Sequence, residues 1–378
     1  MIKEKSKKGW IIGIVIVVII AGFAAGIGGQ IFTRYYLSQF SFFRDISLIS
    51  DNINGQEIVI SQPKKVVVEQ EMQVEQIISD IGPSVVSIFK IKKVSGTGVL
   101  DKILTQSERL SLGFVLTSDG WLVVPAQIAD YKQADLAVVY KNKTYSVQEI
   151  IADDLLNTAF IKIDSQNLPV INLAKKEEIA LGQNVILYDS LNQQLKLNTI
   201  DKINYQNTVT KQSMILSTEE YNDRILLAQP VAENFFGVPA VNLGGAIIGL
   251  CVENNNRQVF VPINYIKAVM DSILAQKQAK HLYLGLKYIN LSSAIGLEET
   301  FYQNLSEGAI VYSVSATSPL ASQLKTNDII YAVENQNISS KLSLMDLLLQ
   351  YRLGDQIKIK FRRDGEDKEA SFTLNEIK

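Results

Sequence analysis

Between Pro83 and Val261 the sequence repeats one pattern, a short apolar or alternating run bounded by turn residues. Runs of this kind are typical of β-strands, and many of them in succession predict an all-β barrel or sandwich domain. The runs are Ser84–Ile91, Gly113–Thr117, Trp121–Ala126, Leu136–Tyr140, Ala159–Ile163, Asn184–Tyr188, Ile225–Ala228, Ile247–Val252 and Val259–Pro262.

Helical periodicity flanks this β-region on both sides. A short helix is expected at Glu69–Ile81, closed by Gly82-Pro83. Asn264–Lys280 is expected to be a helix that links two domains, because its apolar residues share one face. Those residues are Ile266, Val269, Met270, Ile273 and Leu274.

The last part of the chain mixes strands with one helix. The helix is expected at Leu342–Tyr351, and Asp364-Gly365 is a strong hairpin-turn signal. We therefore predict a small α+β domain, with strands at Gly308–Val314, Asp328–Glu334, Gln356–Arg362 and Glu369–Leu374.

Length and single residue types limit the possible chemistry. A chain of 378 residues is long enough for two domains and an anchor, and its net charge of −2 gives no reason to expect nucleic acid binding. Cys251 is the only cysteine, which excludes an intramolecular disulfide, and its apolar surroundings predict a buried strand residue. His281 is the only histidine, so any imidazole-based acid–base or metal site must use it. No metal or other cofactor is predicted.

The N-terminal region contains 21 uncharged residues, Gly9–Gly29. A helix of this length spans a hydrocarbon core of roughly 30 Å, whereas a cleavable signal peptide has an apolar stretch of about 7–15 residues. We therefore predict a retained transmembrane anchor at 9–29, with cleavage near Ala24-Ala25-Gly26 as the alternative. The basic residues before it predict that 1–8 is a cytoplasmic tail and that the rest of the chain is extracytoplasmic. They are Lys3, Lys5, Lys7 and Lys8.

The remaining boundaries follow from changes in pattern. Residues 30–74 are predicted to be a juxtamembrane spacer, with Tyr35-Tyr36 and Phe42-Phe43 near the bilayer interface. Residues 75–275 are assigned to the β-domain and 281–378 to the α+β domain.

A series of segments resembles the HtrA family of exported serine proteases, in the same order as in that family, over about 300 residues, from Val67 to the end. In the β-domain they are Pro83–Ile88, Gly113–Leu122, Asn157–Ile163 and Pro239–Asn242 followed by Gly249-Leu250. The terminal domain resembles that family's PDZ domain through Tyr283-Leu284-Gly285-Leu286, Gly308–Val311, Ser318–Ala321 and Asp328–Ile330. The resemblance implies a mainly β chain, with a trypsin-like double β-barrel followed by a PDZ domain.

The resemblance also locates the positions of a serine-protease triad, and none of them holds a triad residue. The family's His, Asp and Ser positions match Gln127, Asn157 and Phe236. Losing a single triad member costs on the order of 10⁴–10⁶ in rate. We therefore expect no serine-type proteolysis and assign no catalytic residue.

Two alternatives do not restore the triad. An alignment of Asn242–Ala246 with the nucleophile loop places Leu243 at the serine position, and His281 follows the linker helix, outside the β-domain. The acidic pairs Asp153-Asp154 and Glu219-Glu220 are interpreted as solvated turns instead of a replacement active site.

The PDZ-like positions, in contrast, are intact. PDZ domains add an extended peptide as a strand and capture its terminal carboxylate with backbone N–H groups. By resemblance, the capturing loop is Tyr283, Leu284, Gly285 and Leu286, and Leu286–Ile289 would pair with the peptide. Leu344 and Leu348, one helical turn apart, would line the pocket for an apolar last side chain. The alternative is that these leucines belong only to the core.

Three hypotheses of function follow. The first is a membrane-anchored extracytoplasmic pseudoprotease that acts as a scaffold, with a PDZ groove for C-termini or unfolded apolar segments of exported proteins. The second is a regulatory subunit that joins active HtrA-like protease subunits in a mixed oligomer. The resemblance implies assembly through the protease domain, as a homo- or hetero-trimer. The third is proteolysis by an unrecognised mechanism, which a casein or peptide hydrolysis assay would test.

Overall fold

The computed structural model describes residues 15–22, 25–26, 29, 65–91, 98–100, 103–205 and 210–377, and for 65–71 the backbone only. The chain divides into two units, 1–63 and 64–378. Within the described ranges, no helix has both the length and the apolar character needed to cross a membrane. The predicted tail at 1–8 lies outside these ranges, and the predicted anchor at 9–29 and spacer at 30–74 lie partly outside them.

The first part of the larger unit is a closed six-stranded barrel, which follows helix α3 (Lys65–Ile81). Neighbouring strands are antiparallel, and the order around the barrel is β1-β2-β3-β6-β5-β4. The strands are β1 (Val85–Lys90), β2 (Arg109–Val115), β3 (Trp121–Pro125), β4 (Leu136–Tyr140), β5 (Lys143–Asp153) and β6 (Thr158–Ile163).

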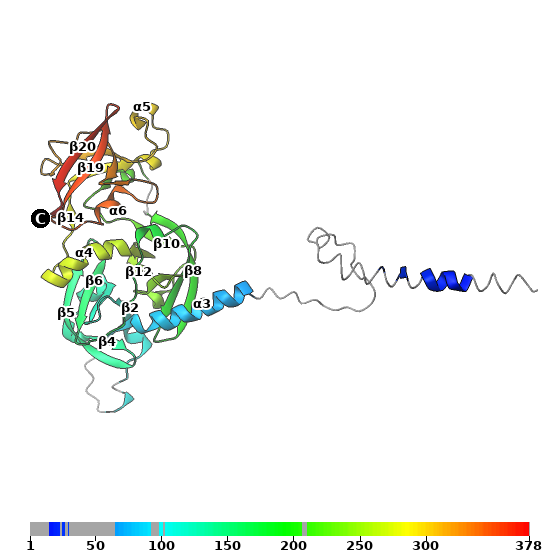
Figure 1. Cartoon of the computed structure of the whole chain (residues 1–378). Coiled ribbons are helices and arrows are strands. Elements are labelled where there is room, and N and C mark those ends of the chain that lie inside the picture. Colours follow the sequence, from blue (N-terminus) through cyan, green and yellow to red (C-terminus); the bar gives the residue numbers. More distant parts are fainter. Residues whose placement is uncertain are drawn as a thin grey trace, which may run out of the picture. The chain divides into compact units, whose positions relative to one another are not determined.

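A second closed barrel follows, with the order β10-β13-β12-β11-β7-β8. Together the two barrels confirm the predicted double β-barrel (Figure 1). Its strands are β7 (Asn184–Asp189), β8 (Gln194–Tyr205), β10 (Arg224–Leu227), β11 (Pro239–Asn242), β12 (Ile247–Asn254) and β13 (Arg257–Pro262). The sequence pattern did not predict β5 and β8, because most of their side chains are exposed or half-buried and the apolar alternation is weak.

Helix α4 (Ile263–Gln276) leads from the barrels to the C-terminal domain and ends at Lys277, whose backbone is left-handed. In Figure 1 this helix lies between the barrels and the C-terminal domain. The domain is α+β, as predicted. Its elements are β14 (Leu282–Tyr283), β15 (Leu286–Asn290), α5 (Glu299–Tyr302), β16 (Ala309–Val314), β17 (Ile329–Val333), β18 (Gln336–Asn337), α6 (Leu344–Leu348), β19 (Gln356–Arg363), β20 (Glu366–Thr373) and β21 (Asn375–Glu376).

The main sheet of this domain contains one strand from outside it. The order is β20-β19-β17-β16-β15-β9, with β18 beside β17. Strand β9 (Leu216–Ser217) comes from the connection between β8 and β10 of the second barrel. The barrel domain therefore supplies the edge strand of the C-terminal sheet.

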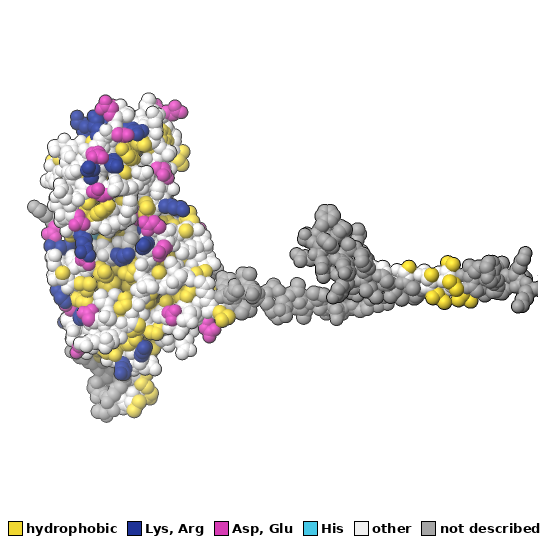
Figure 2. Space-filling view, viewed as in Figure 1, with side chains coloured by type: hydrophobic (Ala, Val, Ile, Leu, Met, Phe, Trp, Pro, Cys, Tyr) yellow, Lys and Arg dark blue, Asp and Glu magenta, His cyan; other side chains and the backbone are white. Residues whose placement is uncertain are grey.

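The hydrophobic core is also shared. One cluster of buried apolar side chains includes Phe160 of the first barrel, Val252 of the second, Ile266 of α4 and Leu344 of the C-terminal domain. A separate cluster fills the first barrel. Cys251 is fully buried in β12, as predicted, and burial raises the pKa of its thiol to about 12. On the face shown in Figure 2, acidic and basic side chains are interspersed over residues 64–378.

Candidate functional site

Gln127 and Asn157, two of the predicted degenerate catalytic positions, lie close together in the first barrel. Gln127 is in the 3₁₀ turn that follows β3, and Asn157 is in the turn before β6. The amide of Ala126 donates to the carbonyl oxygen of Asn157 at 3.2 Å. The Gln127 Oε1 atom is buried and has no hydrogen-bond partner in the structure. Neither side chain can act as a proton-accepting base at neutral pH.

Phe236, the third position, follows a 3₁₀ turn in the second barrel and contacts the first. The amide of Leu112 in β2 donates to its carbonyl oxygen at 2.7 Å. The next residue, Gly237, has φ +78°, and a Cβ there would overlap the carbonyl oxygen of Leu112. Phe235 is buried and Phe236 half-buried, so the neighbouring pair is largely packed. At the position that the resemblance matches with the nucleophile, the loop carries a phenyl ring, which has no hydroxyl group.

The segment of the alternative alignment has a different role. Residues 242–246 form the hairpin turn between β11 and β12, in which Asn242 Oδ1 accepts hydrogen bonds from the amides of Gly244 and Ala246 at 2.9 and 3.0 Å. This turn contains no hydroxyl or thiol side chain.

The interpretation of Asp153 as a solvated turn residue was wrong. Asp153 ends β5 and is 3% exposed, and its Oδ1 atom lies 2.8 Å from Nε2 of His281. His281 is itself 6% exposed and packs edge-on against Tyr221, with ring centroids 4.8 Å apart. The histidine that follows the linker helix therefore does contact the β-domain. This contact joins the β-domain to the segment after α4. The Nδ1 atom of His281 is buried without a hydrogen-bond partner among the described residues, so no hydroxyl or thiol nucleophile is hydrogen-bonded to it.

The predicted carboxylate-binding loop presents backbone donors. Gly285 has φ +68°, and a Cβ there would lie 3.0 Å from both Ser315 Cβ and Tyr283 Oη, so this position favours glycine. Ser318 Oγ donates to the carbonyl oxygen of Leu284 at 2.6 Å and holds the loop, while Tyr283 Oη contacts the hydroxyl of Thr317. The amides of Leu284 and Gly285 point to the same side of the loop.

Those two amides already bind a carboxylate. Glu219 Oε1 accepts hydrogen bonds from Leu284 N at 3.1 Å and from Gly285 N at 2.6 Å. The interpretation of Glu219-Glu220 as a solvated turn was therefore wrong for Glu219 and fits Glu220, which is exposed. Just before Glu219, β9 pairs with β15, with Ser217 facing Lys287 and Leu216 facing Tyr288.

The residues predicted to line the peptide pocket are fully buried and do not line an open groove. Leu344, Leu348 and Leu286 are all 0% exposed and belong to the shared core. Whether Leu344 and Leu348 contact a ligand stays a prediction; in this arrangement of the chain they are core residues.

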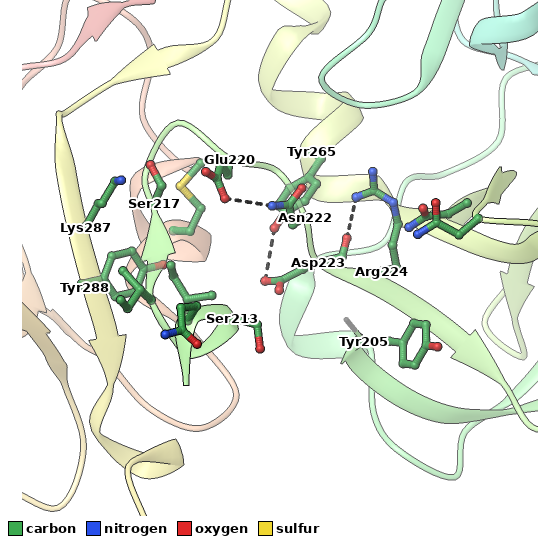
Figure 3. A pocket seen from close by; sticks show the side chains of 16 residues that line it. Tyr205, Ser213, Ser217, Glu220, Asn222, Asp223, Arg224, Tyr265, Lys287 and Tyr288 are labelled. Carbon is green, nitrogen blue, oxygen red and sulfur yellow. Dashed lines mark hydrogen bonds between the residues drawn. The ribbon is translucent and has the colours of Figure 1, made fainter. Parts of the chain in front are cut away.

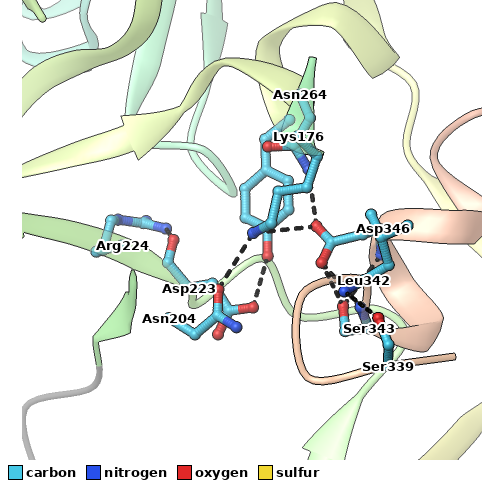
Figure 4. Close-up of polar contacts among 10 residues, drawn as sticks. Lys176, Asn204, Asp223, Arg224, Asn264, Ser339, Leu342, Ser343 and Asp346 are labelled. Carbon is cyan, nitrogen blue, oxygen red and sulfur yellow. Dashed lines mark hydrogen bonds and ion pairs between the residues drawn. The ribbon is translucent and has the colours of Figure 1, made fainter. Parts of the chain in front are cut away.

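A buried polar cluster fixes α6 against the barrels and α4 (Figure 4). Asp346 Oδ1 lies 3.3 Å from Lys176 Nζ and 3.0 Å from Asn264 Nδ2, and its Oδ2 accepts hydrogen bonds from Ser343, the N-cap residue of α6. Nearby, Tyr265 donates to Asp223 at 3.2 Å. Burial raises the pKa of the Asp223 carboxyl, and the positive charge of Lys176 opposes that rise.

A cavity of about 600 Å³ lies beside β9. Figure 3 shows side chains from β15 on one side of it and from the 222–224 segment and Tyr265 on the other. Leu216, Ser217, Lys287 and Tyr288 line it, so the paired strands β9 and β15 form part of its wall. Among the described residues, no group of acidic, histidine and cysteine side chains could hold a metal ion.

The sequence did not identify the segment that binds the loop. Ser217, Thr218 and Glu219 lie in a polar stretch between two strands, and only the fold brings them to β15. Their one signal is a Ser-Thr-Glu-Glu run that is also typical of a solvated turn.

The chain is similar to known proteins in sequence and in fold. Residues 283–374 match the PDZ domain family. A probable periplasmic serine endoprotease, DegP-like, of Halomonas elongata is 24% identical, and the match covers 71% of this chain and 57% of that protein. Serine protease HTRA1 of Xenopus tropicalis is 26% identical, and the match covers 70% of this chain and 60% of that protein. The chain thus matches less than two thirds of the length of these relatives.

Solved structures with a similar fold include HtrA-type proteases. The HtrA-type protease AlgW with decapeptide superimposes with a TM-score of 0.52 at 18% identity, covering 80% of this chain and 98% of that one. AlgW with tripeptide gives a TM-score of 0.51 at 19% identity, with 80% and 97% coverage. At this identity the likeness establishes the fold, two barrels followed by a PDZ domain.

Proposed function

Because the chain is an HtrA-family protein with a PDZ domain, we propose that it is a membrane-anchored, extracytoplasmic scaffold that binds chain ends and does not cleave them. Its groove would take C-termini or unfolded apolar segments of exported proteins. The barrel domain would serve as a rigid support for that groove.

One observation carries this proposal. The amides of Leu284 and Gly285 converge on a single carboxylate oxygen, at 3.1 and 2.6 Å. Successive backbone N–H groups in a turn form an anion-binding concavity, and terminal-carboxylate capture uses this arrangement. The loop is therefore built for a carboxylate, whichever chain supplies it.

Binding of short peptides by the full chain in detergent tests the proposal. Fluorescein-labelled peptides ending in Val, Leu or Phe with a free carboxylate should bind saturably in fluorescence polarisation, and the same peptides with an amidated end should not. Gly285→Trp should abolish binding, because a side chain at this left-handed position displaces the loop amides. Equal binding of amidated peptides would contradict the proposal.

The part of the proposal that excludes cleavage rests on Gln127, Asn157 and Phe236. None of these side chains supplies a nucleophilic hydroxyl, a base or an orienting carboxylate, and each triad group is needed for efficient acyl transfer. Casein incubated with the full chain should stay intact. Hydrolysis above background, lost in a Gly237→Trp variant, would reveal an active site that this proposal excludes.

The proposed location rests on the uncharged stretch at 9–29 and its preceding lysines. Relatives named as periplasmic are consistent with an extracytoplasmic domain. After carbonate extraction of cell membranes the chain should stay in the pellet, and external protease should digest residues beyond 64 in spheroplasts. Full release by carbonate would contradict the anchor.

A further inference from the structure

The edge of the predicted peptide groove is already occupied by the chain itself. In the sheet order β16-β15-β9, β15 pairs with β16 on one side and with β9 on the other. An incoming peptide would add to β15 at that second edge. The segment 216–219, which we call the internal strand, therefore occupies the place of a peptide ligand.

The end of the internal strand imitates a chain terminus. Thr218 N donates to the carbonyl oxygen of Leu286 at 3.0 Å, and Leu286 N donates to Thr218 Oγ1 at 3.2 Å. Thr218 therefore makes the last strand-like contacts, and it is completely buried. The carboxylate that follows belongs to the side chain of Glu219 and occupies the loop where a terminal carboxylate would be captured.

Two hydroxyl groups hold this carboxylate in place. Ser217 Oγ donates to Glu219 Oε2 at 2.9 Å, and Thr218 Oγ1 donates to Glu219 Oε1 at 2.6 Å. The neighbouring Glu220 differs from Glu219 in its exposure and in its hydrogen-bond partner. It is exposed, and its carboxylate accepts a hydrogen bond from Asn222 of the same loop at 2.9 Å.

We propose that the internal strand is a built-in competing ligand, which closes the groove until an external C-terminus displaces it. This inference rests on the proposed function and adds its regulation. The side-chain carboxylate of Glu219 and the terminal carboxylate of a peptide cannot be bound together, because both require the amides of Leu284 and Gly285. The apparent affinity for peptides is then reduced by the fraction of molecules whose groove is free.

The geometry favours an internal strand that can leave β15 over one that is permanently bound to it. Strand β9 contains two residues, and only two of its pairs with β15 are formed. The cavity of about 600 Å³ beside Leu216 and Ser217 offers space into which the segment can withdraw. The domains stay joined without it, because His281–Asp153 and Lys176–Asp346 connect them elsewhere.

A pair of matched variants tests this regulation. Glu219→Ala removes the internal carboxylate, whereas Glu220→Ala removes an adjacent carboxylate that does not reach the loop. Hydrogen bonds to a charged group are strong, so Glu219→Ala should tighten binding of free-carboxylate peptides by about tenfold or more. Glu220→Ala should bind like the unaltered chain. Equal affinity of all three proteins would overturn the inference and leave the proposed function intact.

A disulfide that holds the internal strand on β15 tests the opposite change, in which the strand cannot leave the groove. Ser217 faces Lys287 across the antiparallel pair, so Ser217→Cys with Lys287→Cys places two thiols within reach of a disulfide. The native Cys251 should not interfere, because it is buried and its pKa is raised to about 12.

The oxidised double variant should lose peptide binding, and dithiothreitol should restore it in the same sample. Recovery on reduction shows that the protein is folded. Binding by the oxidised form would overturn the inference. If neither Glu219→Ala nor the reduced double variant binds any free-carboxylate peptide, both the receptor function and its internal ligand are refuted.

Discussion

His281 and Asp153 form a buried pair that joins the segment after α4 to the end of β5. Besides His281, Asp153 Oδ1 accepts one hydrogen bond, from Leu156 N at 3.2 Å. His281→Leu would remove one of the two hydrogen-bond partners of the buried Asp153 carboxylate. We expect the free energy of unfolding of the full chain, measured with urea, to fall by about 1–3 kcal/mol.

A double-mutant cycle separates this pair from general packing. When Asp153→Ala is combined with His281→Leu, the loss should be smaller than the sum of the two single losses, because the second change removes a partner that is already missing. Losses that add to within about 0.5 kcal/mol would mean that the two residues act independently.

At the scale of elements, α6 depends on Asp346 for both its start and its position. The carboxylate completes a capping box with Ser343 and forms an ion pair with Lys176, with side chains 2% and 7% exposed. Asp346→Ala removes the ion-pair partner of a buried lysine and leaves Asp223 as the nearby carboxylate. We expect an unfolding free energy lower by about 3–5 kcal/mol in the same denaturation measurement.

An exposed ion pair provides the control. Glu366 lies 3.2 Å from Lys368, and its side chain is 76% exposed. Glu366→Ala should cost no more than about 1 kcal/mol, because water screens this pair. Similar losses for the two substitutions would contradict the role given to Asp346.

Elements with strong apolar alternation could be predicted from the sequence, and those with exposed faces could not. The run at Leu136–Tyr140 became β4 with the predicted bounds. Strands β5 and β8 carry mostly polar outward side chains and were missed. Strand β9 has two residues, and its partner is 70 residues away, so no local pattern marks it.

At the scale of the whole molecule, the barrels and the C-terminal domain share a core, a sheet and buried polar contacts. The two barrels followed by a PDZ domain could be predicted, because the resemblance lies in contiguous motifs. That the loop at Gly285 binds a peptide carboxylate stays a prediction. The occupant of that loop could not be predicted, because Glu219 reaches Gly285 only through the arrangement of the domains.

The predicted triad positions are distributed over both barrels, with Gln127 and Asn157 in the first barrel and Phe236 in the second. Phe236→Ser alone should therefore give no casein hydrolysis above background, because no base or orienting carboxylate stands at the other two positions. Hydrolysis by this single variant would show that another group can activate the serine.

The proposed protein is a receptor that binds chain ends without cutting them. Native mass spectrometry of the full chain, after incubation with an excess of a free-carboxylate peptide ending in Val, tests both parts at once. We predict a one-to-one complex from which the peptide is recovered at its full mass. A shortened peptide, or no complex at any peptide concentration, would contradict the account.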